Sequence, residues 1–282
     1  MRILVTGADG FTGRHFVGAA AAAGHETVAL KADLTQPDAV KREVDVLRPD
    51  AAVHLAAISF VGHADERAFY DVNLFGTLNL LNALRNGTRL QKVLLASSAN
   101  IYGNCEHSPI TEMQPPAPVN HYATSKLAME FMVRARASDL ALVITRPFNY
   151  TGVGQSGQFV IPKLIDHFRR RASRVPMGNL HVQREYNDVR FVCAAYLKLL
   201  ETHVAPGTYN VCTGRTYGLA EIISVLRQLT GHDVQVQVDP ALVRANEIQR
   251  LCGSADLLKT AVGPLPTYTI EETLSWMLSS DA

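Results

Sequence analysis

The 282-residue chain has little of what would suit a secreted disulfide scaffold, a membrane or a nucleic-acid surface. Its four cysteines are scattered without metal-ligand spacing, which indicates reduced thiols and no metal site. There are 27 basic and 26 acidic side chains, and no long run of one sign favours nucleic acid or a membrane surface. No apolar run is long enough to span a bilayer, and the N-terminus enters a strand without a signal-peptide pattern. We therefore expect a cytoplasmic globular protein.

The first half of the chain alternates between short apolar runs and helical stretches. The apolar runs have the fully buried pattern of parallel strands and are Arg2–Thr6, Thr27–Leu30, Ala51–Ala56, Val93–Ser97 and Leu140–Thr145. The helical stretches cover about 12–23, 36–48, 66–86 and 122–137. This alternation predicts right-handed βαβ units, and so an α/β fold with a doubly wound parallel sheet between two layers of helices.

After Asn149 the alternation becomes irregular. A Gly-rich stretch at 151–157 precedes a helix near 160–172 and a loop containing Pro176, Gly178 and Asn179. Further helices are expected at 191–201, 219–230 and from about 270, with strands at 208–211 and 234–238. We predict a dinucleotide-binding domain from 1–154 and 185–214. A smaller, discontinuous substrate domain is predicted from 155–184 and 215–282.

Three glycines follow the first predicted strand where a helix begins. Gly7, Gly10 and Gly13 have the spacing Gly-x-x-Gly-x-x-Gly, which differs from the Gly-x-Gly-x-x-Gly of most dehydrogenases. Glycines at such a turn let a pyrophosphate approach the backbone at a helix N-terminus. The loop therefore predicts a Rossmann-type cofactor site, with Asp9, Phe11 and Thr12 as its other contact residues.

The end of the second strand bears on the choice of cofactor. An acid usually binds the ribose 2′-hydroxyl at this position, but here the strand ends at Lys31. A lysine attracts a 2′-phosphate, so NADP(H) is favoured over NAD(H). Asp33, followed by Leu34, either reaches the adenine amino group or caps the next helix, and both interpretations stay open.

Tyr122 and Lys126 lie four residues apart in a stretch of good helix formers. That spacing puts both side chains on one helical face. A free phenol titrates near ~10, and a cation one turn away favours the phenolate, so the tyrosine becomes a usable acid or base. The same spacing is common on solvated helices, so it does not by itself identify a site.

The chain resembles the extended short-chain dehydrogenase/reductases, or NAD-dependent epimerase/dehydratase family, in the branch that modifies nucleotide-linked sugars. The matching pieces span essentially the whole chain in family order: the glycine loop, Asp33-Leu34, His54–Ala57, Asn73, Ser97–Gly103, Tyr122 with Lys126, and Arg146–Asn149. The resemblance implies that Tyr122 is the acid/base, that Lys126 is its partner and binds the nicotinamide ribose, and that Ser98 bonds the reacting carbonyl oxygen. It further implies cofactor contacts from Leu55, Ala56, Ala57, Asn73 and Pro147. Ser97 is expected to be structural, and His121, where the family usually has proline, to shape the loop.

Asn100 separates the possible reactions. Family members that eliminate water carry Glu at this position, and the 3,5-epimerase/reductase of GDP-fucose synthesis carries Cys. Asn cannot accept a proton at neutral pH, so the chain is expected to be a simple reductase, or at most a 4-epimerase that uses hydride transfer alone. Entry of His107 or His181 into the site is the alternative.

The second half resembles GDP-mannose 4,6-dehydratases and GDP-6-deoxymannose reductases over Gly178–Val189 and 239–254. Arg184 is the expected diphosphate ligand, because a guanidinium forks onto phosphate oxygens. The residues expected at the substrate are Asn100, Phe148, Asn149, Val160, Asn179, Arg184, Arg244, Glu247 and Arg250. Ala245 and Gln249 thin the arginine cluster of the reductase pattern, which weakens the preference for GDP over dTDP or CDP.

The resemblance thus implies NADPH-dependent reduction of the C4 ketone of a nucleotide-linked 4-keto-6-deoxyhexose. GDP-4-keto-6-deoxy-D-mannose is the first candidate, giving GDP-D-rhamnose or GDP-6-deoxy-D-talose. Alternatives are a dTDP- or CDP-linked substrate, a nucleotide-sugar 4-epimerase and, more remotely, a non-catalytic NADP-binding sensor, against which the intact Ser98, Tyr122 and Lys126 argue. A homodimer through helices 66–86 and 122–137 is expected, with no nucleic-acid or membrane partner.

Overall fold

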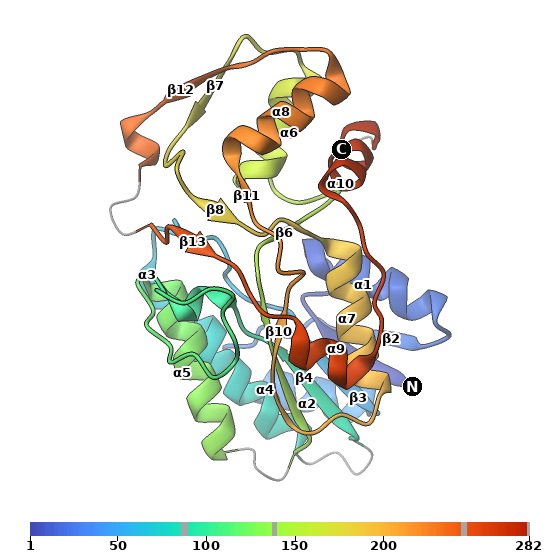
Figure 1. Ribbon diagram of the computed structural model, residues 1–282. Coiled ribbons are helices and arrows are strands. Elements are labelled where there is room, and N and C mark those ends of the chain that lie inside the picture. Colours follow the sequence, from blue (N-terminus) through green and yellow to red (C-terminus); the bar gives the residue numbers. More distant parts are fainter. Residues whose placement is uncertain (86–89, 137–139, 244–246, 281–282) are drawn as a thin grey trace.

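A parallel sheet forms the centre of the computed structural model, which describes residues 1–85, 90–136, 140–243 and 247–280 (Figure 1). Its six strands run in the order β10-β5-β4-β3-β1-β2, and every pair is parallel. The strands are β1 (Arg2–Thr6), β2 (Glu26–Leu30), β3 (Ala51–His54), β4 (Lys92–Ala96), β5 (Leu142–Pro147) and β10 (Gly207–Val211). Strand order reverses beside β1, as a doubly wound sheet requires. The predicted fold class is confirmed.

Alternate residues of each strand face opposite helix layers. Ile3 and Val5 of β1 pack with α1 (Phe11–Ala22) and α7 (Val189–Glu201), whereas Leu4 packs with α2, α4 and α5. These last helices span Pro37–Leu47, Thr77–Leu84 and His121–Arg136. Helices therefore exclude solvent from both faces of the sheet, which explains the unbroken apolar runs in the sequence. In the described residues, no helix combines the length and the apolar character that a bilayer span requires.

The helix predicted over 66–86 is divided into three parts. These are α3 (Glu66–Tyr70), a π-helical segment η1 (Asp71–Gly76) and α4. Single π-turns inside helices often mark functional positions. Here the widened turn carries Asn73, which is fully buried. The exposed rings of Phe75 on η1 and Phe131 on α5 lie on the elements where the sequence predicts pairing of subunits, which stays a prediction.

The smaller part of the molecule has its own apolar core, at the top of Figure 1. Its elements are α6 (Val160–Arg169), β7 (Arg174–Met177), α8 (Leu219–Thr230), β12 (Gln235–Val238) and α10 (Ile270–Ser279). A small sheet joins β11 (Tyr217–Gly218), β8 (Gln183–Arg184) and β13 (Arg250–Leu251). A short 3-10 turn, η3 (Pro240–Leu242), follows β12, and another, η2 (Ala99–Tyr102), follows β4 of the large sheet. Two details differ from the sequence prediction. Pro176 lies in β7, paired with β12, and not in a loop. A helix that the sequence did not predict, α9 (Asp256–Val262), packs on α7 and β10.

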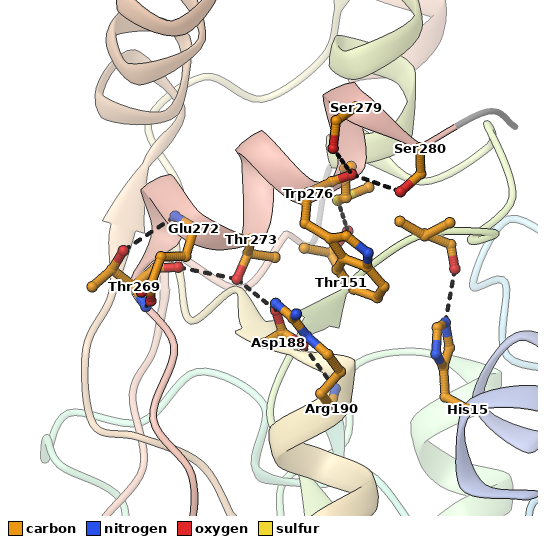
Figure 2. Close-up of polar contacts among 12 residues, drawn as sticks. His15, Thr151, Asp188, Arg190, Thr269, Glu272, Thr273, Trp276, Ser279 and Ser280 are labelled. Atoms are coloured by element: carbon orange, nitrogen blue, oxygen red, sulfur yellow. Dashed lines mark hydrogen bonds and ion pairs between the residues drawn. The ribbon is translucent and has the colours of Figure 1, made fainter. Parts of the chain in front are cut away.

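The final helix, α10, is joined by polar contacts to the start of α7, a helix that packs on the large sheet (Figure 2). Asp188, in the short strand β9 (Asn187–Asp188) paired with β6 (Tyr150–Thr151), caps α7 and accepts a hydrogen bond from Thr273 at 2.8 Å. The Arg190 guanidinium lies 4.1 Å from the centre of the Trp276 ring, which also contacts His15 of α1. These contacts hold α10, in the smaller part of the molecule, against α7 and α1.

Candidate active site

The glycine loop brings the N-terminus of α1 against the end of β1. Gly7 has a φ of +67°, and a Cβ atom added at Gly13 would lie 2.0 Å from the Gly7 carbonyl oxygen. Only glycine fits such a close backbone approach. Gly7, Gly10, Phe11, Thr12 and Gly13 line a cavity of about 400 Å³, as the sequence predicts for a cofactor cradle. The Asp9 side chain is exposed beside it, and its carbonyl accepts from Arg14 at 2.8 Å.

The opposite wall is the turn after β3, which a buried polar chain holds in place. Leu55 and Ala56 donate their backbone N–H groups to the Thr6 hydroxyl, each at 3.1 Å. His54 bridges Thr6 at 2.7 Å and Thr77 at 2.8 Å. Because Thr77 donates its own proton to the Asn73 carbonyl, the His54 Nε2–H must donate to Thr77. Burial, aided by the Lys126 charge, lowers the pKa of His54 to about 3, so it stays neutral.

The three predicted catalytic residues meet in this same cavity. Ser98, Tyr122 and Lys126 line it and are all buried. The Lys126 ammonium donates to the Ala96 carbonyl at 2.8 Å, and burial lowers the pKa of Lys126 to about 8, opposed by the carboxylate of Glu130. Burial raises the pKa of Tyr122, opposed by its hydrogen bond with Ser98. The phenol is therefore protonated at neutral pH and is suited to donate a proton.

The residues after β2 form a turn outside the lining of this cavity. The Lys31 side chain is exposed, and the Glu43 carboxylate accepts the backbone N–H groups of Lys31 and Ala32 at 2.9 and 2.7 Å. Asp33 accepts from the N–H and hydroxyl of Thr35, which lowers the pKa of its carboxyl. It does not cap α2, whose N-cap is Gln36, so that alternative is wrong. Leu34 is buried in the core.

Asn73 connects two segments near the site through side-chain hydrogen bonds and does not itself line the cavity. Its amide accepts from Ile58 N–H at 2.9 Å and donates to the Ile58 carbonyl and to the Ser125 hydroxyl, each at 3.1 Å. Ser125 in turn donates to the Tyr122 carbonyl at 2.8 Å. The structure therefore places Asn73 between the loop after β3 and the first turn of α5. It does not line the cavity that its predicted cofactor contact would require.

A second cavity, of about 420 Å³, adjoins the first and reaches the smaller part of the molecule. Ser59, Asn100, Asn149 and Phe159 line both, so the two cavities are adjacent. Of the predicted substrate residues, those that line the second cavity are Asn100, Asn149, Val160, Asn179, Arg184 and Glu247, while Phe148 lines the first. Pro147, predicted as a cofactor contact, also lines the first cavity. Arg250 is exposed on β13 outside both linings. Arg244 lies outside the described residues.

Arg184 and Glu247 are brought together as a pair. The guanidinium NH2 lies 2.6 Å from the Glu247 carboxylate and also donates to the carbonyl of Ile248, while NH1 donates to the carbonyl of Gln183 at 3.0 Å. Only 5% of Arg184 is exposed. The expected diphosphate ligand is therefore held by protein acceptors, and the expected nucleotide-binding carboxylate is one of them.

Several side chains that line the two cavities were not predicted from the sequence, and two of them have polar groups left unpaired by the described residues. Lys163, in the first turn of α6, lines the second cavity, and its side-chain ammonium has no hydrogen bond or ion pair within the described residues. Its place three residues after Val160, on the same helical face, is the signal that could have found it. Ser97, predicted to be structural, lines the first cavity with its buried hydroxyl unpaired.

Unsatisfied polar atoms indicate where a ligand fits. Within the described part of the chain, the Ser97 hydroxyl and the Asn149 side-chain oxygen are buried without a partner, and both residues line the cofactor cavity. Buried polar groups are nearly always paired, so these atoms are suited to bonds with a bound molecule. Together with the glycine cradle, they fit a dinucleotide. No cluster of three His, Cys, Asp or Glu side chains able to hold a metal occurs among the described residues.

His107 and His181, the alternative second acid/base groups, are both exposed and lie outside the linings of the two cavities. Asn100 instead occupies the junction between the cavities.

Residues 3–212 match the NAD dependent epimerase/dehydratase family. The chain belongs to this family. It is 36% identical over 294 residues to the GDP-6-deoxy-D-mannose reductase of Pseudomonas aeruginosa, covering 99% of this chain and 96% of the relative. It is 33% identical over 277 residues to the GDP-6-deoxy-D-talose 4-dehydrogenase of Aggregatibacter actinomycetemcomitans, covering 93% and 92%. The solved structure of RMD from Pseudomonas aeruginosa complexed with NADPH superposes with a TM-score of 0.90 at 34% identity, covering 99% of this chain and 97% of that one.

As an epimerase/dehydratase family member, the protein is an NAD(P)-dependent oxidoreductase. Its cofactor cradle would be formed by Gly7, Gly10 and Gly13, with Ser98, Tyr122 and Lys126 at the reacting end of the same cavity. The family identity thus agrees with the geometry built from the residues.

Proposed function

We propose that the protein reduces the C4 ketone of a nucleotide-linked 4-keto-6-deoxyhexose with NADPH, with GDP-4-keto-6-deoxy-D-mannose as the first candidate substrate. One observation carries the proposal. The cavity that holds Ser98, Tyr122 and Lys126 adjoins, at Asn100, a second cavity of about 420 Å³ that reaches the smaller part of the molecule. This arrangement supports a ketone positioned at the junction, within reach of both parts.

The cofactor, when bound, supplies the hydride that C4 accepts. Ser98 and Tyr122 both donate hydrogen bonds to the C4 oxygen, where negative charge develops. Tyr122 then transfers its phenolic proton to that oxygen, so that the ketone gains one hydride and one proton and becomes an alcohol. The Lys126 ammonium stabilises the phenolate that remains.

The neutral side chain at Asn100 supports reduction over elimination or 3,5-epimerisation. Those reactions remove a carbon-bound proton and need a second acid/base beside the sugar. An amide cannot accept that proton. The exposed positions of His107 and His181 further support a reaction in which Tyr122 is the one proton-transfer group.

The preference for NADPH rests on Lys31 at the end of β2 and on the NADPH complex of the similar reductase structure. The preference for GDP rests on the two GDP-sugar relatives. Lys163 provides positive charge along the second cavity, whereas the charge of Arg184 is paired with Glu247. The names of these relatives differ in the sugar configuration, so either GDP-D-rhamnose or GDP-6-deoxy-D-talose is a product consistent with them.

The test follows NADPH and NADH oxidation at 340 nm with GDP-, dTDP- and CDP-linked 4-keto-6-deoxy sugars, and identifies each product by NMR. We expect stoichiometric NADPH consumption that is fastest with the GDP sugar. In a parallel assay with nucleotide-linked 4-hydroxy sugars, conversion of a sugar to its 4-epimer without net cofactor consumption would instead identify a 4-epimerase. Binding of NADPH without turnover of any of these sugars would contradict the proposal.

A further inference from the structure

Two buried charges of opposite sign lie directly behind the catalytic pair. Glu130 is fully buried on α5, one helical turn beyond Lys126, which is itself one turn beyond Tyr122. The Arg146 guanidinium donates to both of its carboxylate oxygens, from Nε at 3.0 Å and from NH2 at 2.7 Å. Such bidentate pairs fix orientation as well as distance.

The same guanidinium reaches a third segment of the chain. Its NH1 donates to the Tyr102 hydroxyl at 2.9 Å, and its Cζ lies 4.9 Å from the centre of the Tyr102 ring. Tyr102 donates its own proton to the Asn210 side-chain oxygen at 2.7 Å. Burial raises the pKa of Tyr102 to about 12, so the phenol keeps the proton that this bond needs.

These contacts join the segments that carry the proposed chemistry. Arg146 directly precedes Pro147, which lines the cofactor cavity at the end of β5. Tyr102 ends η2, the turn whose N-cap is Ser98. Glu130 lies on the helix that holds Tyr122 and Lys126. A shift of any one of these segments would therefore strain the network.

Stability alone does not explain a charged pair at this position. Two ions buried together lose much of their hydration, and apolar side chains of similar volume often serve as well or better. Among the groups that interact with Lys126 in the described residues, Glu130 is the one that raises its pKa. The other nearby titratable groups differ: His54 is neutral, Tyr102 is protonated, and Glu66 and Asp71 on α3 and η1 are partly or largely exposed.

We propose that the Glu130–Arg146 ion pair is a positioning group, which holds Ser98, Lys126 and the end of β5 in their relative places and balances the buried Lys126 ammonium with a carboxylate. Arg134, half-exposed on α5, adds a bond to the same carboxylate at 3.0 Å. The inference rests on the proposed function, because it assigns the pair a role in that reaction.

The test compares Glu130→Gln with Arg146→Gln, through kcat and the NADPH dissociation constant between pH 6 and pH 10. Glu130→Gln removes the balancing carboxylate and leaves the Arg146 cation, so the alkaline limb of both profiles should move down by about one pH unit. Arg146→Gln removes the buried cation and leaves the carboxylate with only the half-exposed Arg134 as its partner among the described residues, so the limb should move up. A purely structural pair would give lower activity in both variants with the limb unmoved, and that result, or shifts in the same direction, would overturn the proposal.

Two further variants keep the test decisive. Lys126→Met should abolish the limb in NADPH binding, which assigns the limb to Lys126. Arg146→Lys keeps the charge but loses the fork, so we expect a kcat at least about three-fold lower with the limb unchanged; a shifted limb there would contradict the proposal even if Arg146→Gln fails to fold.

NADPH binding needs no sugar, which separates the two hypotheses. Limbs that shift as expected in a protein that reduces none of the tested sugars would reject the proposed function and retain the positioning role. Reduction of a sugar by a protein whose alkaline limbs do not move in the variants would retain the proposed function and reject the positioning role.

Discussion

The cofactor half of the site is built from strand ends and the turns that follow them, whereas the substrate half is assembled from segments far apart in the chain. Gly7–Gly13, Leu55–Ala57 and Ser97-Ser98 each follow a strand of one parallel sheet, so the carboxyl edge of that sheet brings them together. In the substrate half, Arg184 meets Glu247 across 63 residues of sequence separation. The residues at a sheet edge can therefore be predicted from short patterns around each strand. The residues of a site between separate segments depend on how those segments pack.

The largest effect is expected at the reacting end of the cofactor half. Tyr122→Phe removes the proton donor, so kcat should fall by about 10²–10⁴-fold. NADPH affinity should stay within about three-fold, because the cradle is untouched. NADPH oxidation and NADPH fluorescence titration measure the two quantities, with Tyr70→Phe on α3 as the control tyrosine. Substantial activity in Tyr122→Phe would remove the reason for treating this cavity as catalytic.

The cradle itself is tested by Gly13→Ala. The added Cβ would lie 2.0 Å from the Gly7 carbonyl oxygen, so the turn must move, at a cost near the upper end of about 1–3 kcal/mol. We expect NADPH affinity to fall by up to about 100-fold. Gly18→Ala, on the same helix with no atom within 4 Å of the new Cβ, is the matched control and should gain up to about 1 kcal/mol of stability. Equal NADPH affinity in the two variants would show that the close approach is not needed.

The substrate half is tested by Lys163→Met. A charge-assisted hydrogen bond contributes about 1.5–3 kcal/mol, so KM for the nucleotide sugar should rise by about 10–100-fold while the NADPH dissociation constant stays unchanged. The control is Lys41→Met on α2, whose ion pair with Asp45 is exposed and worth little. Equal changes in KM and in NADPH affinity would mean that the two halves are not energetically separate.

The smallest effect concerns stability below neutral pH. The pKa of His54 is near 6.5 in the unfolded chain and about 3 in the folded one, so the unfolded state binds the extra proton first. His54 therefore destabilises the fold progressively as pH falls from 6.5 towards 3, by at most about 1.4 kcal/mol per pH unit, and has no effect above pH 6.5. Urea unfolding midpoints between pH 7 and pH 4 measure this slope. We expect His54→Asn to be less stable at pH 7 but to show a shallower slope, and an identical slope would assign the pH dependence to other groups.

Local patterns predicted the parts of the site that depend on neighbours in sequence. The Tyr122–Lys126 spacing, the glycine turn and the apolar runs each encode a geometry within a few residues, and the structure brings Ser98, Tyr122 and Lys126 into one cavity as expected. The same reasoning did not reveal that Asn73 faces Ser125 behind the wall, or that the Ser97 hydroxyl faces the cavity. A buried polar side chain takes its role from its partners, and those partners are distant in sequence.

The sequence by itself determined the parallel sheet and the glycine turn, because strand burial and glycine spacing are set over a few residues. Helical spacing placed Tyr122 and Lys126 on one face, and the family resemblance supplied their predicted catalytic role. Tertiary structure alone decided that Pro176 joins a strand, since the strand exists through its pairing with β12. It also decided that Arg184 binds Glu247, and that Glu130, Arg146 and Tyr102 form one network behind Lys126. Such contacts depend on how whole segments pack, and no local pattern in the chain encodes them.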